Sequence, residues 1–190
     1  MTASAQQVLQ FWFADENAVR WFRRDPEFDQ IIRERFGATL DAAELGALDN
    51  WTVTPHGWLA LLIVLDQFSR NVYRGDARAF AQDNRAQSLA LEGLERRDDE
   101  ALAPLERVFA YLPLEHAEDL ALQWRSVTLF RALGLQATPN ARGQYEGFLD
   151  YARRHCEVIA RYGRFPHRNA ALGRPSTPDE QAYLAEGGGF

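Results

Sequence analysis

Three short stretches of this chain combine side chains that can bind ions or move protons. The first, at 65–74, reads Leu-Asp-Gln-Phe-Ser-Arg-Asn-Val-Tyr-Arg and holds carboxylate, amide and guanidinium groups. The second, at 111–119, places a histidine among acids, and the third, at 161–169, collects arginine, histidine and asparagine around Gly163 and Pro166. Each stretch has both a structural and a functional interpretation.

The polar groups of the first stretch are predicted to project as two rows from one end of a helix. Asp66 and Arg70 are four residues apart, and Gln67, Asn71 and Arg74 form a second row beside them. Side chains three or four positions apart share a helix face and can pair. The structural interpretation is an ion-paired helix end, and the functional one is part of an anion-binding site.

The second stretch contains a histidine with carboxylates on both sides. Acids are favoured at a helix N-terminus by its dipole, which is a complete structural explanation. A histidine beside a carboxylate can also act as a general base near neutral pH. His116 is therefore a candidate catalytic residue, with Glu115 and Asp119 as its neighbours.

The third stretch is a predicted loop between two helices, and loops of this kind often carry function. Arg164, Arg168 and Asn169 are candidate ligand-binding residues, because arginine forks suit carboxylate or phosphate. His167 is the second candidate for acid–base chemistry. The structural alternative is that the arginines cap the carbonyls ending the preceding helix and pair with acids.

Several other chemistries are not expected. There is no His-Glu-x-x-His, no Glu-x-x-His, no Gly-x-Gly-x-x-Gly and no Gly-x-Ser-x-Gly. We therefore expect neither a metal nor a cofactor, with Glu115, His116 and Asp119 as the only local metal-ligand candidates. The chain has no lysine, which excludes a lysine nucleophile or Schiff base. The single cysteine, Cys156, lies on an apolar stripe and is predicted to be core.

Composition is typical of a soluble globular protein. Of the 190 residues, 46% are hydrophobic and 12% aromatic, which is enough to build a sizeable core. The net charge of −6 argues against nucleic-acid binding through overall charge. The longest apolar run, Trp58 to Leu65, is too short to span a bilayer, and Met1 to Gln10 does not resemble a signal peptide. We expect a cytoplasmic protein with no nucleic-acid or membrane partner.

Helix-start signals recur along the chain and predict an all-α fold. A capping box at 4–7 opens a short helix, and Thr or Asp precedes proline at 25–26, 54–55 and 177–178. No stretch alternates with period two, so no sheet is expected. Beyond the first short helix, helices are predicted at 26–48 (with a break allowed at Gly37), 55–73, 76–96, 104–112, 116–133, 141–162 and 178–185.

The run from Trp58 to Leu65 is apolar on every side, and such a helix is usually surrounded by others. We therefore expect a single domain, 1–190, of antiparallel helix pairs packed around this central helix. The pairs would be of tetratricopeptide size, although no second copy of that repeat spacing is visible. The last residues, 185–190, are glycine-rich and are predicted to fray.

The three polar stretches also resemble the signature of a known family. Leu65-Asp66-Gln67-Phe68-Ser69-Arg70-Asn71, Leu114-Glu115-His116 and Arg164-Phe165-Pro166-His167-Arg168-Asn169 are similar to motifs of the bacterial domain of unknown function 924. The opening at 8–13, Val-Leu-Gln-Phe-Trp-Phe, is similar to the start of that family. The resemblance implies a tetratricopeptide-like helical fold and no established activity, substrate or cofactor.

We interpret the three stretches as one polar, arginine-rich pocket for a small anionic ligand. His116 and His167 would supply acid–base capacity without a metal, and Arg168 is expected to face a water-filled pocket because its loop holds many cations and few acids. The rival interpretation is a tetratricopeptide-like module that binds a protein or peptide without catalysis. The oligomeric state is left open. The candidate ligand-binding residues are Asp66, Gln67, Arg70, Asn71, Arg74, Glu115, Arg164, Arg168 and Asn169.

Overall fold

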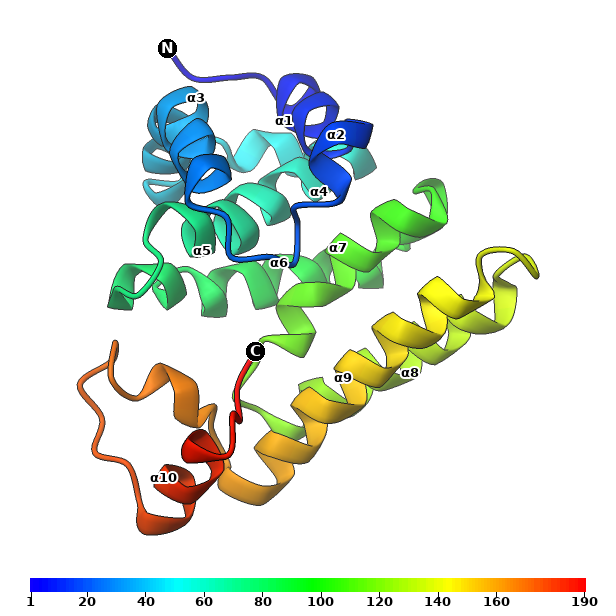
Figure 1. Cartoon of the computed structure of the whole chain (residues 1–190). Coiled ribbons are helices and arrows are strands. Elements are labelled where there is room, and N and C mark those ends of the chain that lie inside the picture. Colours follow the sequence, from blue (N-terminus) through cyan, green and yellow to red (C-terminus); the bar gives the residue numbers. More distant parts are fainter. The chain divides into compact units, whose positions relative to one another are not determined.

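The computed structural model describes every residue from Met1 to Phe190 and contains helices but no strands (Figure 1). The predicted all-α class is confirmed. The chain divides into two compact units, Met1–Arg74 with Arg78–Pro113 (unit 1) and Gly75–Ala77 with Leu114–Phe190 (unit 2). The single domain and the tetratricopeptide-like pairing stay predictions. None of the helices combines the length and hydropathy needed to cross a bilayer.

The helices of unit 1 build an aromatic core, and the boundary between the units falls inside α7. Five rings are buried there, and each has its centroid within 6.3 Å of at least one other of the set: Phe11, Trp12, Phe28, Phe68 and Phe109. Unit 2 contains α8, α9 and α10. The helix bounds are α1 (Ala5–Trp12), α2 (Asp15–Ala18), α3 (Pro26–Glu44), α4 (Pro55–Leu62), α5 (Ser69–Val72), α6 (Asp83–Glu95), α7 (Pro104–Glu115), α8 (Leu120–Gln136), α9 (Arg142–Tyr162) and α10 (Pro178–Ala185).

The predicted helix starts are formed by side-chain caps. Ser4 and Thr177 each complete a capping box, which satisfies backbone N–H groups that have no partner within the helix. Asp25 and Thr54 accept from backbone N–H groups of α3 and α4 directly before a proline. These local signals fix where the chain turns into a helix.

The apolar run from Trp58 to Leu65, which begins in α4, is buried on all sides, as predicted. Every residue from Trp58 to Leu65 has 0% exposure. The indole of Trp58 donates to the carbonyl of Leu89, 2.7 Å away, and lies directly against Gly93 of α6. A Cβ atom at Gly93 would lie 2.1 Å from the Trp58 ring, so only glycine allows this approach.

The predicted helix at 55–73 is not regular. After α4 the chain forms a π-helical segment, Ile63–Phe68, before α5 resumes the α geometry. A π turn is rare and often marks a functional position. This one contains Asp66 and Gln67, both buried. Hydrophobic periodicity does not reveal the change because both geometries keep the apolar side chains inside.

Other helix boundaries differ from the predicted ones by three to seven residues. The helix α7 continues through Pro113 to Glu115, and α8 begins only at Leu120, because Asp119 caps it by accepting from the Leu122 N–H. The predicted helix at 76–96 begins at Asp83, after a 3₁₀ turn at Ala77–Phe80. The helix α3 passes Gly37 unbroken and ends at Glu44.

In unit 2, α8 and α9 lie side by side as an antiparallel pair (Figure 1). The helix α9 ends at Gly163 in the left-handed region, φ 69°, as its sequence predicts. The last residues, expected to fray, instead fold back on α9. The ring of Phe190 packs against His155 and Phe165.

Candidate functional site

The polar groups of the first stretch form an ion-pair network inside unit 1. Arg70 lies 2.9 Å from an oxygen of Asp66 and 3.0 Å from one of Asp83, on α6. Gln67 donates to the second oxygen of Asp66 at 2.6 Å. Burial alone would lower the pKa of Arg70, but the two carboxylates outweigh it and raise that pKa, so the guanidinium stays charged.

The second row of the same stretch converges on Asp29 of α3. Arg74 donates to both of its oxygens, at 2.7 and 2.8 Å, and Asn71 donates to one at 2.7 Å. Four of the five predicted binding residues of unit 1, Gln67, Arg70, Asn71 and Arg74, thus bind Asp29, Asp83 or the fifth, Asp66, which matches the structural interpretation. The roles of Asp29 and Asp83 were not predicted, because neither is near the stretch in sequence.

In unit 2, Glu115 and His116 meet a third group that sequence analysis did not single out, His155 of α9. Donor atoms of these three side chains all lie within 4.8 Å of one another. Glu115 is 3% exposed and His155 5%. The Nδ1 atom of His155 lies 2.9 Å from the carbonyl of Tyr151 and 3.3 Å from Oε1 of Glu115. Burial, with His116 nearby, lowers the pKa of His155 to about 2 and keeps its imidazole neutral.

The backbone that carries Glu115 and His116 is held at three consecutive carbonyls. The fully buried amide of Gln123 donates to the carbonyls of Glu115 and Ala117, at 2.6 and 2.8 Å. Arg168 donates to the carbonyl of His116 at 3.0 Å. Side chains from α8 and from the loop after α9 therefore fix the position of this connection.

Arg168 does not face a water-filled pocket, so that expectation is wrong. Its side chain is buried at 5% residue exposure, and its guanidinium lies over the Phe165 ring at 4.4 Å. His167 lies on the same aromatic group, 5.6 Å from Phe165 and 5.8 Å from Phe190 between ring centroids. The loop residues thus pack around Phe165 as a core.

Arg164 and Asn169 both bind Glu180 at the start of α10. Arg164 donates to both carboxylate oxygens at 2.6 and 2.8 Å, and Asn169 donates to one at 3.3 Å. The Arg164 hydrogen bond and the Thr177 N–H lower the pKa of Glu180 to about 2. These contacts tie α10 to the loop and leave Arg164 neutralised.

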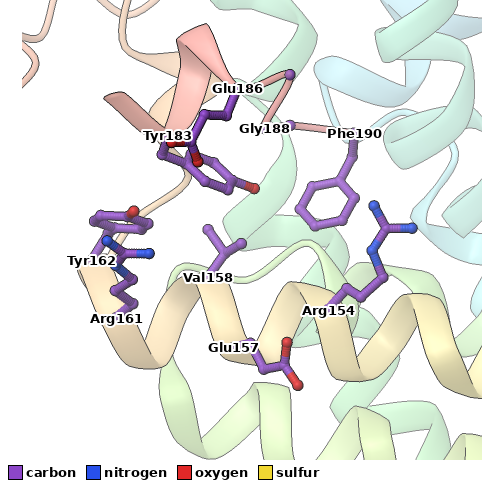
Figure 2. Close-up of a pocket in the computed structure, with 11 residues that line it drawn as sticks. Arg154, Glu157, Val158, Arg161, Tyr162, Tyr183, Glu186, Gly188 and Phe190 are labelled. Carbon is purple, nitrogen blue, oxygen red and sulfur yellow. The ribbon is translucent and has the colours of Figure 1, made fainter. Parts of the chain in front are cut away.

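A surface pocket of about 400 Å³ lies between α9, α10 and the tail 187–190 (Figure 2). Figure 2 shows Arg154 and Val158 rising from α9 toward the rings of Phe190 and Tyr183. Arg154 and Arg161 form no ion pair, and their guanidinium groups lie over aromatic rings. The lining residues are Arg154, Glu157, Val158, Arg161, Tyr162, Tyr183, Glu186, Gly187, Gly188, Gly189 and Phe190.

One polar atom at this pocket lacks a partner. The hydroxyl oxygen of Tyr162 is buried and makes no hydrogen bond within the protein. The pocket residues Arg154, Glu157 and Arg161 were not among the predicted site residues. Their spacing by three and four on one helix was the available signal, since it places all three on one face of α9.

Four predicted site residues, Glu115, His116, His167 and Arg168, belong to one neighbourhood in unit 2. Asp66 and Arg70 belong to unit 1. The single site that would join the three stretches stays a prediction. His155 was missed because it sits beside Ala152 and Cys156 on the buried side of α9. A histidine on an apolar face was the signal that could have identified it.

Comparison with known proteins identifies the family of the chain. A family model described as "Bacterial protein of unknown function (DUF924)" matches residues 8–188. The chain belongs to this family. A solved structure from Agrobacterium tumefaciens, the protein of unknown function ATU0120, is 38% identical with a TM-score of 0.85. The match covers 96% of this chain and 97% of that one. Among curated proteins, none is detectably similar.

Proposed function

We propose that unit 2 of this DUF924 protein binds a small anionic ligand in the pocket between α9, α10 and the tail. The observation that carries the proposal is the pair Arg154 and Arg161, two guanidinium groups that line the pocket without a carboxylate partner. Arginine forks bind carboxylate and phosphate groups strongly. This location differs from the predicted one, because Arg74 and Arg164 are already bound to acids.

The rest of the lining suggests the other features of the ligand. A volume of about 400 Å³ suits a small molecule, and the rings of Tyr183 and Phe190 offer apolar surface. Glu157 and Glu186 also line the pocket. Their carboxylates would repel a purely anionic molecule and would accept hydrogen bonds from a hydroxyl or ammonium group. The ligand class is therefore an anion with an apolar body and a hydrogen-bond donor.

The test uses simple probes of this class. We expect 4-hydroxybenzoate and phenyl phosphate to raise the melting temperature of the protein, and neutral benzyl alcohol to leave it unchanged. A ligand that binds only the folded state at 100 times its Kd stabilises it by about 2.7 kcal/mol. Titration followed by amide NMR should shift signals of α9, α10 and residues 187–190.

Matched variants locate the binding site. Arg154→Gln and Arg161→Gln should each weaken binding by about tenfold or more, because a charge-assisted bond is lost. Arg153→Gln is the control, since Arg153 is exposed on the same helix and does not line this pocket. Equal affinities in all three variants would rule out the pocket as the site. His116 and His167 do not line it, so catalysis by them is not included.

The peptide-binding alternative has one favourable observation. Trp124 is 58% exposed beside a groove of about 230 Å³ that residues of α8 and α9 line, including Val127 and Arg153. Exposed tryptophan is enriched where proteins bind one another. Binding that is lost in Trp124→Ala and kept in Arg154→Gln would favour this groove over the pocket.

A further inference from the structure

We propose that Glu115, His116 and His155 form a binding site for one divalent transition-metal ion, with Zn²⁺ as the ion that their donor atoms suit best. The inference goes beyond the proposed anion pocket and does not depend on it. All three residues lie in unit 2, on α7, the connection before α8, and α9.

The donor set is the first argument. Two imidazole nitrogens and one carboxylate oxygen are typical ligands of zinc sites that keep an open coordination position. The donor atoms, one from each residue, lie within 4.8 Å of one another. Tetrahedral zinc with bonds of about 2.1 Å needs donor separations of about 3.4 Å. Small side-chain rotations would therefore close the site around an ion.

The support around these residues is the second argument. A metal site requires its ligands to be held in place by hydrogen bonds from their surroundings. Gln123 and Arg168 together hold the carbonyls of residues 115, 116 and 117, which fixes the backbone of two of the ligands. The third ligand, His155, is held from one side by the Tyr151 carbonyl and from its face by the Phe190 ring.

The alternative interpretation is a hydrogen-bonded Glu–His pair that binds no ion, and the experiment below distinguishes the two.

The experiment uses full-length protein without an affinity tag, stripped of metal by a chelator. Zn²⁺ is titrated in competition with a chromophoric chelator, and bound zinc per chain is measured by mass spectrometry after dialysis. We expect one Zn²⁺ per chain. Glu115→Gln, His116→Gln and His155→Gln should each weaken zinc binding by at least about 100-fold, since even supporting residues cost 10–100-fold. His56→Gln is the control, because His56 is an exposed histidine outside unit 2.

A second measurement keeps the test valid if a buried variant fails to fold. Co²⁺ added to the unmodified protein should give the visible absorption bands of a nitrogen- and oxygen-ligated site, and Zn²⁺ should remove them. His116→Gln, at the less buried ligand, should abolish those bands while keeping its helical circular dichroism. Absence of stoichiometric binding, or binding that is equal in His116→Gln, would overturn the proposal. Zinc binding that is normal in Arg154→Gln would show that the two sites are independent.

Discussion

The imidazole of His155 lies nearly parallel to the ring of Phe190, with ring centroids 3.5 Å apart and an interplanar angle of 17°. This stacking holds the tail 187–190 against α9. Phe190 therefore has two roles, because it covers the buried His155 and forms one wall of the surface pocket. The same ring therefore contacts both the His155 side chain and the surface pocket.

The stacking predicts that Phe190→Ala will release the tail. Ring currents from Phe190 shift the His155 ring protons upfield, so the substitution should move those NMR signals downfield. Amide hydrogen exchange at residues 187–189 should also become faster, since loosely packed segments exchange from locally open states. Phe22→Ala, at an exposed ring of unit 1, is the control. Unchanged His155 signals would show that the stacking is absent in solution.

Leu62→Ala tests the central position of α4. Leu62 is 0% exposed, and its truncation removes buried apolar surface and leaves a cavity. The free energy of unfolding should fall by roughly 2–5 kcal/mol, measured by urea denaturation. Leu45→Ala, at a leucine that is 85% exposed, should change it by no more than about 0.5 kcal/mol. An unchanged urea midpoint for Leu62→Ala would contradict the described core.

Arg70→Met tests the ion-pair network of unit 1. The substitution leaves the buried carboxylates of Asp66 and Asp83 without their shared cation. The free energy of unfolding should fall by about 3–5 kcal/mol, and the double variant Arg70→Met/Asp66→Asn should recover part of the loss. Arg97→Met, at an exposed ion pair, should cost about 1 kcal/mol or less. Additive losses in the double variant would argue against direct coupling.

Arg168→Ala should destabilise the fold, in contrast to the sequence-based expectation. The His116 carbonyl loses a charged donor, and the Phe165 face loses the guanidinium that covers it. We expect a loss of about 1–3 kcal/mol in thermal or urea unfolding. Arg125→Ala, at an exposed arginine of α8, serves as the control. A stability equal to that of the control would support a binding role for Arg168 over a structural one.

The ion pair between Glu180 and Arg164 is expected to make the free energy of unfolding depend on pH. The pKa of Glu180 is lowered from 4.5 to about 2 in the folded protein, chiefly by Arg164. A depressed carboxyl pKa stabilises the fold above the unfolded-state pKa, and that contribution is lost as pH falls toward the folded-state value. The stability difference between the unmodified protein and Glu180→Gln should therefore be largest above about pH 5 and shrink toward pH 2.

Urea unfolding at several pH values between 2 and 6 measures this dependence. In an Arg164→Gln background the pH-dependent difference should become much smaller, because the main cause of the pKa shift is gone. A difference between the two proteins that stays constant from pH 6 to pH 2 would contradict the Arg164–Glu180 interaction.

The sequence by itself determined the features that depend on near neighbours. Caps at Ser4, Asp25, Thr54 and Thr177 set helix starts because a side chain three residues away satisfies the exposed N–H groups. The continuous apolar run from Trp58 to Leu65 predicts a segment that is buried on all sides. Gly163 predicts the end of α9, because glycine readily adopts the left-handed conformation of a helix C-cap. The family motifs were also readable directly, since they are short and ordered along the chain.

Only the tertiary structure decided which charges meet and which do not. Asp29 and Arg74 are 45 residues apart, and Arg164 and Glu180 lie on different elements, so local patterns cannot pair them. His155 joined Glu115 and His116 because α9 packs on the connection before α8, a contact that depends on three-dimensional packing. Pairing of this kind decides which arginines are neutralised, and it left Arg154 and Arg161 at the pocket without carboxylate partners.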